Sequence, residues 1–292
     1  MLATRRLPGE AWDELGDIEL GTLSTKHDDV EVLVVANEPV DLDLFPSLRL
    51  IASFGVGYEE IDVDACRARG VAVTNTPGVL DAATADLAFG LVVAVRRRIV
   101  EGDDLVRDGG WVTPWSSGPF LGRDVSGATL GIVGLGRIGS AVARRGQAFD
   151  MHVLHHRRTP SGDPGYRELE ALLRESDVVS LHTPLTGETT GLISRERLAL
   201  MRDGATLVNT ARGAVVDEDA LVDELVSGRL SAGLDVFVHE PRVPDALRGL
   251  PNVVLTPHIG SATVETRSAM TRVVVENVLA FARGEPLQTR VV

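Results

Sequence analysis

Segments typical of strands and of helices alternate along almost the whole chain. Short runs rich in Val, Ile and Leu, bounded by Gly, Pro or Asn, are typical of buried strands. They occur at residues 30–36, 48–53, 71–75, 129–133, 151–156, 177–182, 205–211, 232–237 and 252–256. Helical patterns occur at residues 62–68, 82–108, 137–149, 166–176, 194–201, 217–227 and 263–283. This alternation predicts a doubly wound α/β fold with parallel sheets.

Residues at the ends of several predicted helices are typical of helix caps. Asp62 and Asp217 stand where an N-cap is expected, because their side chains can accept a backbone N–H of the first turn. Gly70, Gly228 and Gly284 follow the expected last turns, where glycine adopts a left-handed conformation without strain. These signals fix the limits of three helices.

The alternation is interrupted once, by a segment rich in Gly, Pro and Ser at residues 109–127. Long loops inside compact domains usually carry function or form contacts. This one contains Trp111 and Trp115, for which two interpretations stay open: packing in the core, or a dimer interface that reaches towards a neighbouring site. We expect two domains, residues 1–93 with 264–292 and residues 94–263, with the last helix crossing back to the first domain.

Composition excludes several classes of protein. Hydrophobic residues make up 44% of the 292, so a sizeable core can form. A net charge of -13 argues against nucleic acid as a main partner, since phosphate binding needs a basic surface. The longest apolar run, residues 87–95, is roughly half of what a membrane helix needs. The single cysteine, Cys66, and the absence of a signal-peptide pattern predict a cytoplasmic protein.

A glycine-rich turn follows the strand at residues 129–133. Gly134, Gly136 and Gly139 have the spacing G-x-G-x-x-G between a strand and an amphipathic helix, with a second strand beyond. We assign the first glycine to the tight turn, the second to close approach of a pyrophosphate and the third to helix packing. A glycine-rich turn without a ligand is the less favoured alternative. The sequence therefore predicts a dinucleotide site.

The end of that second strand predicts which dinucleotide is bound. An acid usually stands there to bind the ribose 2′-hydroxyl of NAD. Here the sequence is His155-His156-Arg157-Arg158-Thr159, and two arginines would instead pair with a 2′-phosphate. We therefore expect a preference for NADP, with NAD also possible. The alternative is an exposed basic turn that only keeps the surface hydrated.

Three charged side chains follow the last three predicted strands. Arg212, Glu240 and His258 come shortly after residues 205–211, 232–237 and 252–256. Ligands of open parallel sheets bind at the carboxyl ends of the strands, so the three side chains should lie at one edge. A guanidinium, a carboxylate and an imidazole suit binding of a carboxylate and proton transfer beside it. Taken singly, each could be a surface charge or a structural residue, so the hypothesis depends on all three.

At this point the sequence resembles the D-isomer-specific 2-hydroxyacid dehydrogenases, and most closely their glyoxylate/hydroxypyruvate (2-ketogluconate) reductase branch. The matching segments are ASFGVGYEEID (52–62), VAVTNTPGVL (71–80), TADLAFGL (84–91), LGRDVSGATLGIVGLGRIG (121–139), DVVSLHTPLTGETTGLI (177–193), LVNTARGAVVDEDAL (207–221), GLDVFVHEP (233–241) and TPHIGSAT (256–263). The resemblance implies two Rossmann-like domains with the active site in the cleft between them. The first domain would be flavodoxin-like and bind substrate; the second would bind NAD(P).

The resemblance also implies roles for individual residues. His258 would be the acid/base, Glu240 its partner, and Arg212 the anchor of the substrate carboxylate. The backbone N–H groups of Val56 and Gly57 would hold the same carboxylate. Trp115, with Phe54 and Leu80, would shape the substrate pocket. The implied cofactor residues are Thr84, Gly134, Leu135, Gly136, Arg137, Ile138, Gly139, Arg157, Arg158, Thr159, His182, Thr183, Pro184, Thr189, Thr210, Ala211, Asp235, His258 and Gly260.

The expected activity is NADPH-preferring reduction of a small 2-oxo acid to the D-2-hydroxy acid. Two alternatives stay open: a family member for a different 2-oxo acid, and a non-catalytic NAD(P)-sensing protein on the same scaffold. No cluster of His, Cys, Asp and Glu has metal-ligand spacing, so we expect no metal. The resemblance further implies a homodimer formed through the nucleotide-binding domain, and we expect no nucleic-acid or membrane partner.

Overall fold

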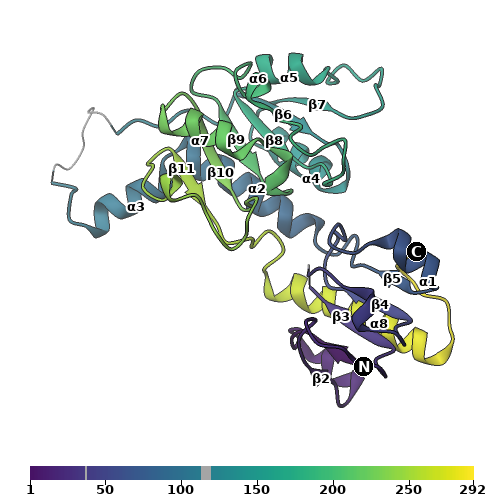
Figure 1. Ribbon diagram of the computed structural model, residues 1–292. Helices are drawn as coiled ribbons and strands as arrows, with labels where there is room; N and C mark the ends of the chain where they lie inside the picture. The colour runs from purple at the N-terminus through teal and green to yellow at the C-terminus, as the bar shows by residue number, and fades with distance from the viewer. Residues whose placement is uncertain (37, 113–119) are drawn as a thin grey trace. The chain divides into compact units, whose positions relative to one another are not determined.

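The structure, a computed structural model, describes residues 1–36, 38–112 and 120–292 and contains two compact units (Figure 1). Unit 1 consists of Met1–Ala83 with Ser261–Val292, and unit 2 of Thr84–Gly260. The last helix belongs to unit 1. Both boundaries lie earlier in the chain than the predicted ones at residues 94 and 264. Each unit is described by itself.

Unit 1 is built on a sheet of parallel strands in the order β2-β1-β3-β4-β5. Its strands are β1 (Leu2–Ala3), β2 (Glu19–Leu20), β3 (Val32–Val35), β4 (Leu50–Ser53) and β5 (Ala72–Thr74). This is the flavodoxin-like order, in which the winding direction reverses between β1 and β3. All four residues of β3 and all four of β4 are buried, as expected for strands covered on both faces.

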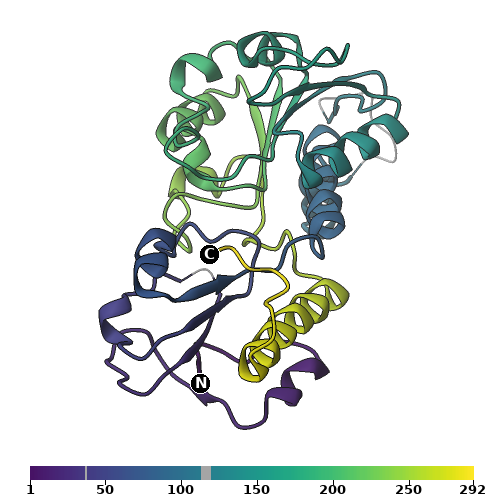
Figure 2. The ribbon, with the colours of Figure 1, turned by 90° about the vertical axis from the view of Figure 1, so that its right-hand side faces the viewer.

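The helices of unit 1 are η1 (Glu10–Leu15), η2 (Leu42–Leu44), α1 (Val63–Arg69) and α8 (Val264–Arg283). Two of them, α1 and α8, end where the predicted glycine signals stand, and α1 begins at its predicted N-cap. The Asp62 side chain accepts a hydrogen bond from the Ala65 N–H at 2.9 Å, and Gly70 ends α1 with a φ of 72°. Gly284 ends α8 in the same conformation. The long α8 packs against β4 and η1 (Figure 2).

Unit 2 is built on a six-stranded parallel sheet in the order β11-β10-β9-β8-β6-β7. Its strands are β6 (Thr129–Val133), β7 (His152–His156), β8 (Val178–Leu181), β9 (Thr206–Asn209), β10 (Ser231–Leu234) and β11 (Val253–Leu255). The strand β6 lies between β7 and β8, so the winding direction reverses there. Such a switch point is where open α/β sheets bind ligands.

Helices cover both faces of the unit 2 sheet (Figure 2). The helices of unit 2 are α2 (Asp81–Arg96), α3 (Ile99–Arg107), α4 (Arg137–Ala148), α5 (Leu169–Glu175), α6 (Arg195–Leu198) and α7 (Glu218–Val226), with the short turns η3 (Gly213–Val215) and η4 (Asp245–Leu247), and all but α3 pack against the body of the unit. Val178 packs in a core with α2 and α4, while its neighbour Val179 packs on the other face with α5, α6 and α7. Alternate residues of a strand point to opposite faces, which explains the continuous apolar runs.

The helical pattern predicted at residues 82–108 forms two helices instead of one. Arg98 adopts a left-handed conformation with a φ of 53°, which ends α2 and starts α3 in a new direction. The residues Ala85, Ala88 and Val92 of α2 are buried in the unit 2 core, which explains why unit 2 begins before residue 94. None of the residues of α3 is buried, and Figure 1 shows this helix projecting from the body of unit 2.

Candidate active site

The three charged side chains predicted to lie together follow three neighbouring strands of unit 2. Arg212 follows β9, Glu240 follows β10 and His258 follows β11. The strand β10 pairs in parallel with both β9 and β11. Because the carboxyl ends of parallel strands share one edge, the guanidinium, the carboxylate and the imidazole lie at the same edge of the sheet.

His258 and Glu240 form a direct pair. The His258 Nδ1 lies 2.7 Å from Glu240 Oε2, and Glu240 Oε1 accepts a hydrogen bond from the Phe237 N–H at 3.0 Å. Burial raises the pKa of Glu240, but the bonds from His258 and Phe237 and the charges of His258 and Arg212 outweigh burial, so the pKa lies below its ordinary value. The ionised carboxylate favours a proton on Nδ1. The imidazole keeps 38% of its side-chain surface exposed, which leaves Nε2 available for proton transfer.

A buried carboxylate shapes the turn that carries His258. Asp235 is 1% exposed; its Oδ1 accepts hydrogen bonds from Thr256 Oγ1 at 2.6 Å and the Ile259 N–H at 2.8 Å. Its Oδ2 accepts the Gly260 N–H at 2.8 Å. Burial raises the pKa of Asp235, against the effect of these bonds. His258 has a φ of 52°, which is unfavourable for a residue with a Cβ, and the bonds to Asp235 hold it there.

Arg212 stands in extended backbone just before η3. Its Nη1 donates a hydrogen bond to the Ala211 carbonyl oxygen at 2.7 Å. The Asn209 side chain donates from Nδ2 to the Arg212 carbonyl oxygen at 2.9 Å and accepts the Ala211 N–H at 3.0 Å. The charge of Arg212 contributes to the lowered pKa of Glu240, so the guanidinium acts electrostatically on the His258–Glu240 pair.

The glycine-rich turn has the shape that a phosphate cradle needs. Gly134 has a φ of 97°, and a Cβ there would lie 2.6 Å from the His182 carbonyl oxygen. A Cβ at Gly139 would lie 2.1 Å from the Gly134 carbonyl oxygen, so only glycine lets α4 approach β6 this closely. A Cβ at Gly136 would meet no atom within 4 Å, which leaves open space at the N-terminus of α4. Phosphates bind at such helix N-termini.

Two buried hydroxyl groups at the same edge lack partners within the described residues. They are Thr183 Oγ1, after β8, and Thr210 Oγ1, after β9. Buried polar atoms are nearly always hydrogen-bonded, so unsatisfied hydroxyls beside an open cradle suit a polar ligand. Burial lowers the pKa of His182 to about 4, so its imidazole is neutral beside the predicted phosphates. The residues present therefore fit a dinucleotide, which the Gly134–Gly139 turn and these threonines would hold.

The remaining predicted cofactor residues lie near the same strand ends. They are Leu135, Arg137 and Ile138 after β6, Arg157, Arg158 and Thr159 after β7, Pro184 and Thr189 after β8, Ala211 after β9, Asp235 after β10, Gly260 after β11, and Thr84 on α2. Arg158 Nη1 lies 3.5 Å from Glu188 Oε2, and both side chains are exposed. The role of Asp235 towards a nicotinamide carboxamide and the roles of the others stay predictions.

The predicted substrate residues outside unit 2 are Val56 and Gly57, in the loop that follows β4 of unit 1. Asn75 Nδ2 donates to the Val56 carbonyl oxygen at 2.9 Å. The Asn75 carbonyl oxygen accepts Thr289 Oγ1 at 2.6 Å, so the C-terminal segment holds the base of this loop. Its role in binding a carboxylate stays a prediction. Trp115 lies outside the described residues.

Three residues that support the site were not predicted from the sequence. Thr256 bonds Asp235, Asn209 holds the Arg212 backbone, and Glu218 Oε1 accepts the Val238 N–H at 2.9 Å in the loop before Glu240. The sequence Asn209-Thr210-Ala211 does contain a signal, because asparagine often accepts the backbone N–H two residues later. Thr256 and Glu218 act across long sequence separations and have no local signal.

The sheet order, the glycine turn at the switch point and the polar edge define the class of protein, an NAD(P)-dependent oxidoreductase. Residues 89–260 match the family described as D-isomer specific 2-hydroxyacid dehydrogenase, NAD binding domain. The glyoxylate reductase of Pyrococcus furiosus is 48% identical over 290 residues, covering 94% of this chain and 86% of that protein. The chain therefore belongs to the D-isomer-specific 2-hydroxyacid dehydrogenases.

Solved structures agree with this assignment. A protein from Thermus thermophilus is 47% identical with a TM-score of 0.93, covering 100% of this chain and 99% of that one. An NADPH-dependent glyoxylate/hydroxypyruvate reductase from Sinorhizobium meliloti, in complex with NADP and malonate, is 36% identical with a TM-score of 0.89, covering 99% and 95%. Both likenesses extend over the two α/β units. Within the described residues, no helix is both long and apolar enough to cross a membrane.

Proposed function

We propose that the protein reduces a small 2-oxo acid, such as glyoxylate or hydroxypyruvate, to the 2-hydroxy acid, which has the D configuration where C2 of the product is chiral, with NADPH as the preferred cofactor. The observation that carries the proposal is the His258–Glu240 pair, 2.7 Å apart, at the sheet edge that also holds Arg212 and the glycine turn. The names of the similar proteins from Pyrococcus furiosus and Sinorhizobium meliloti support glyoxylate and hydroxypyruvate as substrates. The single buried free cysteine, Cys66, supports a cytoplasmic location.

Each residue of the site has a distinct task in the proposed reaction. Arg212 binds the substrate carboxylate, because a planar guanidinium forms two parallel charge-assisted bonds with it. His258 gives a proton to the carbonyl oxygen as negative charge develops there. Glu240 orients the ring, because its Oε2 lies 2.7 Å from His258 Nδ1 and fixes the proton on that nitrogen. A bound reduced nicotinamide supplies the hydride.

A panel of 2-oxo acids tests the proposed function. The purified protein is mixed with NADPH and glyoxylate, hydroxypyruvate, pyruvate or 2-ketogluconate, and the loss of NADPH absorbance is followed. We expect turnover with glyoxylate or hydroxypyruvate. Tight NADPH binding without turnover of any member of the panel would instead identify a nucleotide-sensing protein. Turnover of pyruvate or 2-ketogluconate alone would assign another branch of the family.

The preference for NADPH depends on the two arginines after β7. Arg157 and Arg158 are exposed at the end of the strand, where the adenosine ribose is bound in this fold. We expect Arg157→Ala to lower kcat/KM for NADPH by about tenfold, since one charge-assisted bond to the 2′-phosphate is lost. The value for NADH should stay unchanged, because NADH lacks that phosphate. Steady-state kinetics with both cofactors makes the comparison.

The same measurement on Arg248→Ala serves as the control for the cofactor prediction. Arg248 is an exposed arginine of unit 2 that pairs with Asp245 on η4, away from the end of β7. Its removal changes the net charge equally and should leave both kcat/KM values unchanged. Arg158 shares its charge with Glu188, so Arg158→Ala should have a smaller effect than Arg157→Ala. A wild-type protein that prefers NADH contradicts the prediction.

We further propose a homodimer formed through unit 2, with α3 in the interface. Exposed apolar side chains gather on this helix and just beyond it, at Ile99, Val106, Trp111 and Val112, of which Val112 is 84% exposed. Apolar side chains that gather at a surface mark interaction sites. The exposed course of α3 supports the same assignment, because a helix with no buried residue gains little from its own unit.

Light scattering tests the dimer. The wild-type protein should have twice the mass of one chain at micromolar concentration. Val106→Glu, which puts a charge into the proposed interface, should shift the protein towards the monomer. Val226→Glu is the control, because Val226 is similarly exposed on α7 and should leave the dimer intact. A monomeric wild-type protein, or equal effects of the two variants, contradicts the proposal.

A further inference from the structure

We propose that Asn209 is the positioning residue for Arg212, and that its side-chain amide fixes the backbone from which the guanidinium reaches the substrate carboxylate. The inference rests on the proposed function, since it assumes that Arg212 binds that carboxylate. Asn209 is the last residue of β9 and is 2% exposed. Its side chain makes hydrogen bonds to the backbone of Ala211 and of Arg212, two and three residues further along the chain.

The two hydrogen bonds of Asn209 enclose the peptide that carries Arg212. Oδ1 accepts the Ala211 N–H at 3.0 Å, and Nδ2 donates to the Arg212 carbonyl oxygen at 2.9 Å. The Val215 N–H also donates to this carbonyl, at 3.3 Å. Arg212 has a φ of -146° and a ψ of 144°, which is extended backbone, and it stands at the N-cap of η3. The amide of Asn209 therefore determines the direction in which the arginine side chain leaves the backbone.

The guanidinium is bonded to the Ala211–Arg212 peptide, which lies between the two hydrogen bonds of Asn209. Arg212 Nη1 donates to the Ala211 carbonyl oxygen at 2.7 Å. A rotation of the Ala211–Arg212 peptide would therefore move the backbone and the guanidinium together. A displacement of a substrate-binding guanidinium by about 1 Å greatly weakens its binding of the carboxylate, because bidentate pairing needs both hydrogen bonds aligned.

The Arg212 turn also supports the loop that leads to Glu240. A Cβ at Gly213 would lie 2.1 Å from the Phe237 carbonyl carbon, so the two segments are in close backbone contact. The Phe237 N–H in turn donates to Glu240 Oε1. Asn209 thus holds the turn that carries Arg212, and this turn packs against the loop that leads to Glu240.

Asparagine suits this position because the site needs one acceptor and one donor on the same small side chain. Aspartate keeps the acceptor for the Ala211 N–H but places a second oxygen against the Arg212 carbonyl oxygen. Serine keeps a single hydroxyl and cannot make both bonds at this spacing. Either change therefore loses at least one of the two bonds, at a residue that is only 2% exposed and has little water to replace it.

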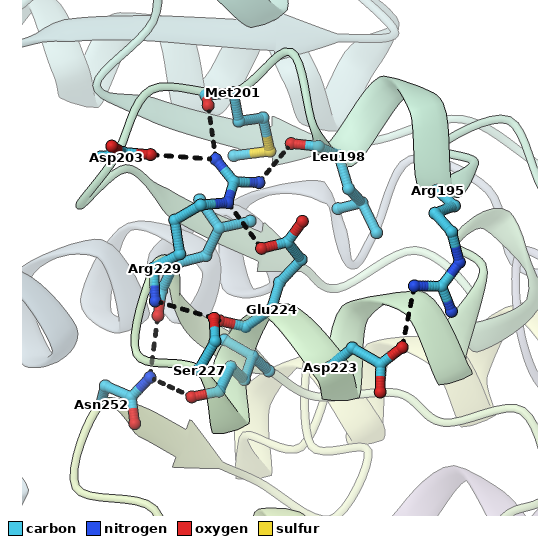
Figure 3. Close-up of polar contacts among 11 residues, drawn as sticks. Arg195, Leu198, Met201, Asp203, Asp223, Glu224, Ser227, Arg229 and Asn252 are labelled. Atoms are coloured by element: carbon cyan, nitrogen blue, oxygen red, sulfur yellow. Dashed lines mark hydrogen bonds and ion pairs between the residues drawn. The ribbon is translucent and has the colours of Figure 1, made fainter.

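Asn252 offers a matched control in the same unit. Its Nδ2 donates to the Leu225 carbonyl oxygen at 3.0 Å and to the Leu230 carbonyl oxygen at 2.8 Å. Figure 3 shows it beside Arg229 and Ser227, in the polar cluster after α7. Asn252 precedes β11, so it stands at the edge of the sheet opposite to the candidate site. Asn252→Asp removes two amide bonds to backbone carbonyls without touching Arg212.

The experiment compares Asn209→Asp, Asn209→Ser and Asn252→Asp with the wild type in thermal denaturation and in steady-state kinetics, at a temperature where all are folded. All three should lower Tm. Only the Asn209 variants should raise KM for the 2-oxo acid, by about tenfold, and they should raise it by more than KM for NADPH, for which Thr210 and Ala211 are only part of the predicted site. If Asn209 only stabilised the fold, its variants would lower Tm without raising KM for the 2-oxo acid more than KM for NADPH.

The outcomes separate the inference from the proposed function. If wild type turns over a 2-oxo acid and Arg212→Ala raises its KM, but neither Asn209 variant does, the positioning role is overturned. Failure of both Asn209 variants to fold at any temperature overturns it as well, because Asn209 would then be required for the sheet itself. If wild type turns over none of the 2-oxo acids, the proposed function fails instead.

Discussion

Replacing His258 by alanine should lower kcat for reduction of the 2-oxo acid by about 10²–10⁴-fold, the usual effect of removing a general acid. The imidazole is the group proposed to give a proton to the carbonyl oxygen, and its Nδ1 lies 2.7 Å from Glu240 Oε2. Binding of NADPH, measured by quenching of protein fluorescence, should be retained, since the glycine turn is untouched. Stopped-flow measurement of a single turnover shows whether the loss lies in the chemical step.

Two further variants distinguish proton transfer from a general loss of structure. His152→Ala removes an exposed histidine from β7 and should leave kcat unchanged. Glu240→Gln keeps the size of the partner but removes its charge, so it should lower kcat by less than His258→Ala does. A His258→Ala enzyme with wild-type kcat would show that the proton comes from elsewhere.

Replacing Arg212 by alanine should raise KM for the 2-oxo acid and lower kcat/KM by about 10²-fold or more. Removing one partner of a desolvated, hydrogen-bonded charge pair costs about 2–5 kcal/mol, and each 1.4 kcal/mol is tenfold. The carboxylate of the substrate would be the partner left without its charge. KM for NADPH should change little, because Arg212 follows β9 while the glycine turn follows β6. Initial rates over a range of both substrates measure the two KM values.

Arg212→Lys tests whether geometry or charge dominates. An ammonium group keeps the charge but cannot make two parallel bonds, so this variant should recover only part of the lost activity. Full recovery by lysine would show that charge alone suffices. An unchanged KM in Arg212→Ala would remove Arg212 from the substrate site and leave Val56 and Gly57 as the predicted carboxylate-binding groups.

The fold was predictable from local patterns, because buried parallel strands are short, apolar and bounded by residues that favour turns. The predicted strand at residues 129–133 is β6, and the caps at Asp62 and Asp217 accept the N–H groups of Ala65 and Ala220. The break between α2 and α3 was missed. Arg98 adopts a positive φ there, and no glycine or proline marks that position in the sequence.

The charged residues of the candidate site were predictable because each follows its own strand, and parallel strands bring their carboxyl ends to one edge. The supporting bonds were not. Thr256 reaches Asp235 and Glu218 reaches Val238 through the tertiary fold alone. Likewise, the sequence alone does not show why residue 139 must be a glycine. The structure shows the reason, because a Cβ at Gly139 would lie 2.1 Å from the Gly134 carbonyl oxygen.

The most direct test of the account follows the hydride and the configuration of the product in one reaction. Hydroxypyruvate is reduced by the wild-type protein with NADPH carrying deuterium at the transferable position of C4, and the product is analysed by mass spectrometry and chiral chromatography. We predict D-glycerate with one deuterium at C2, and loss of this product in His258→Ala. L-glycerate, or the absence of deuterated product from any 2-oxo acid, would contradict the account.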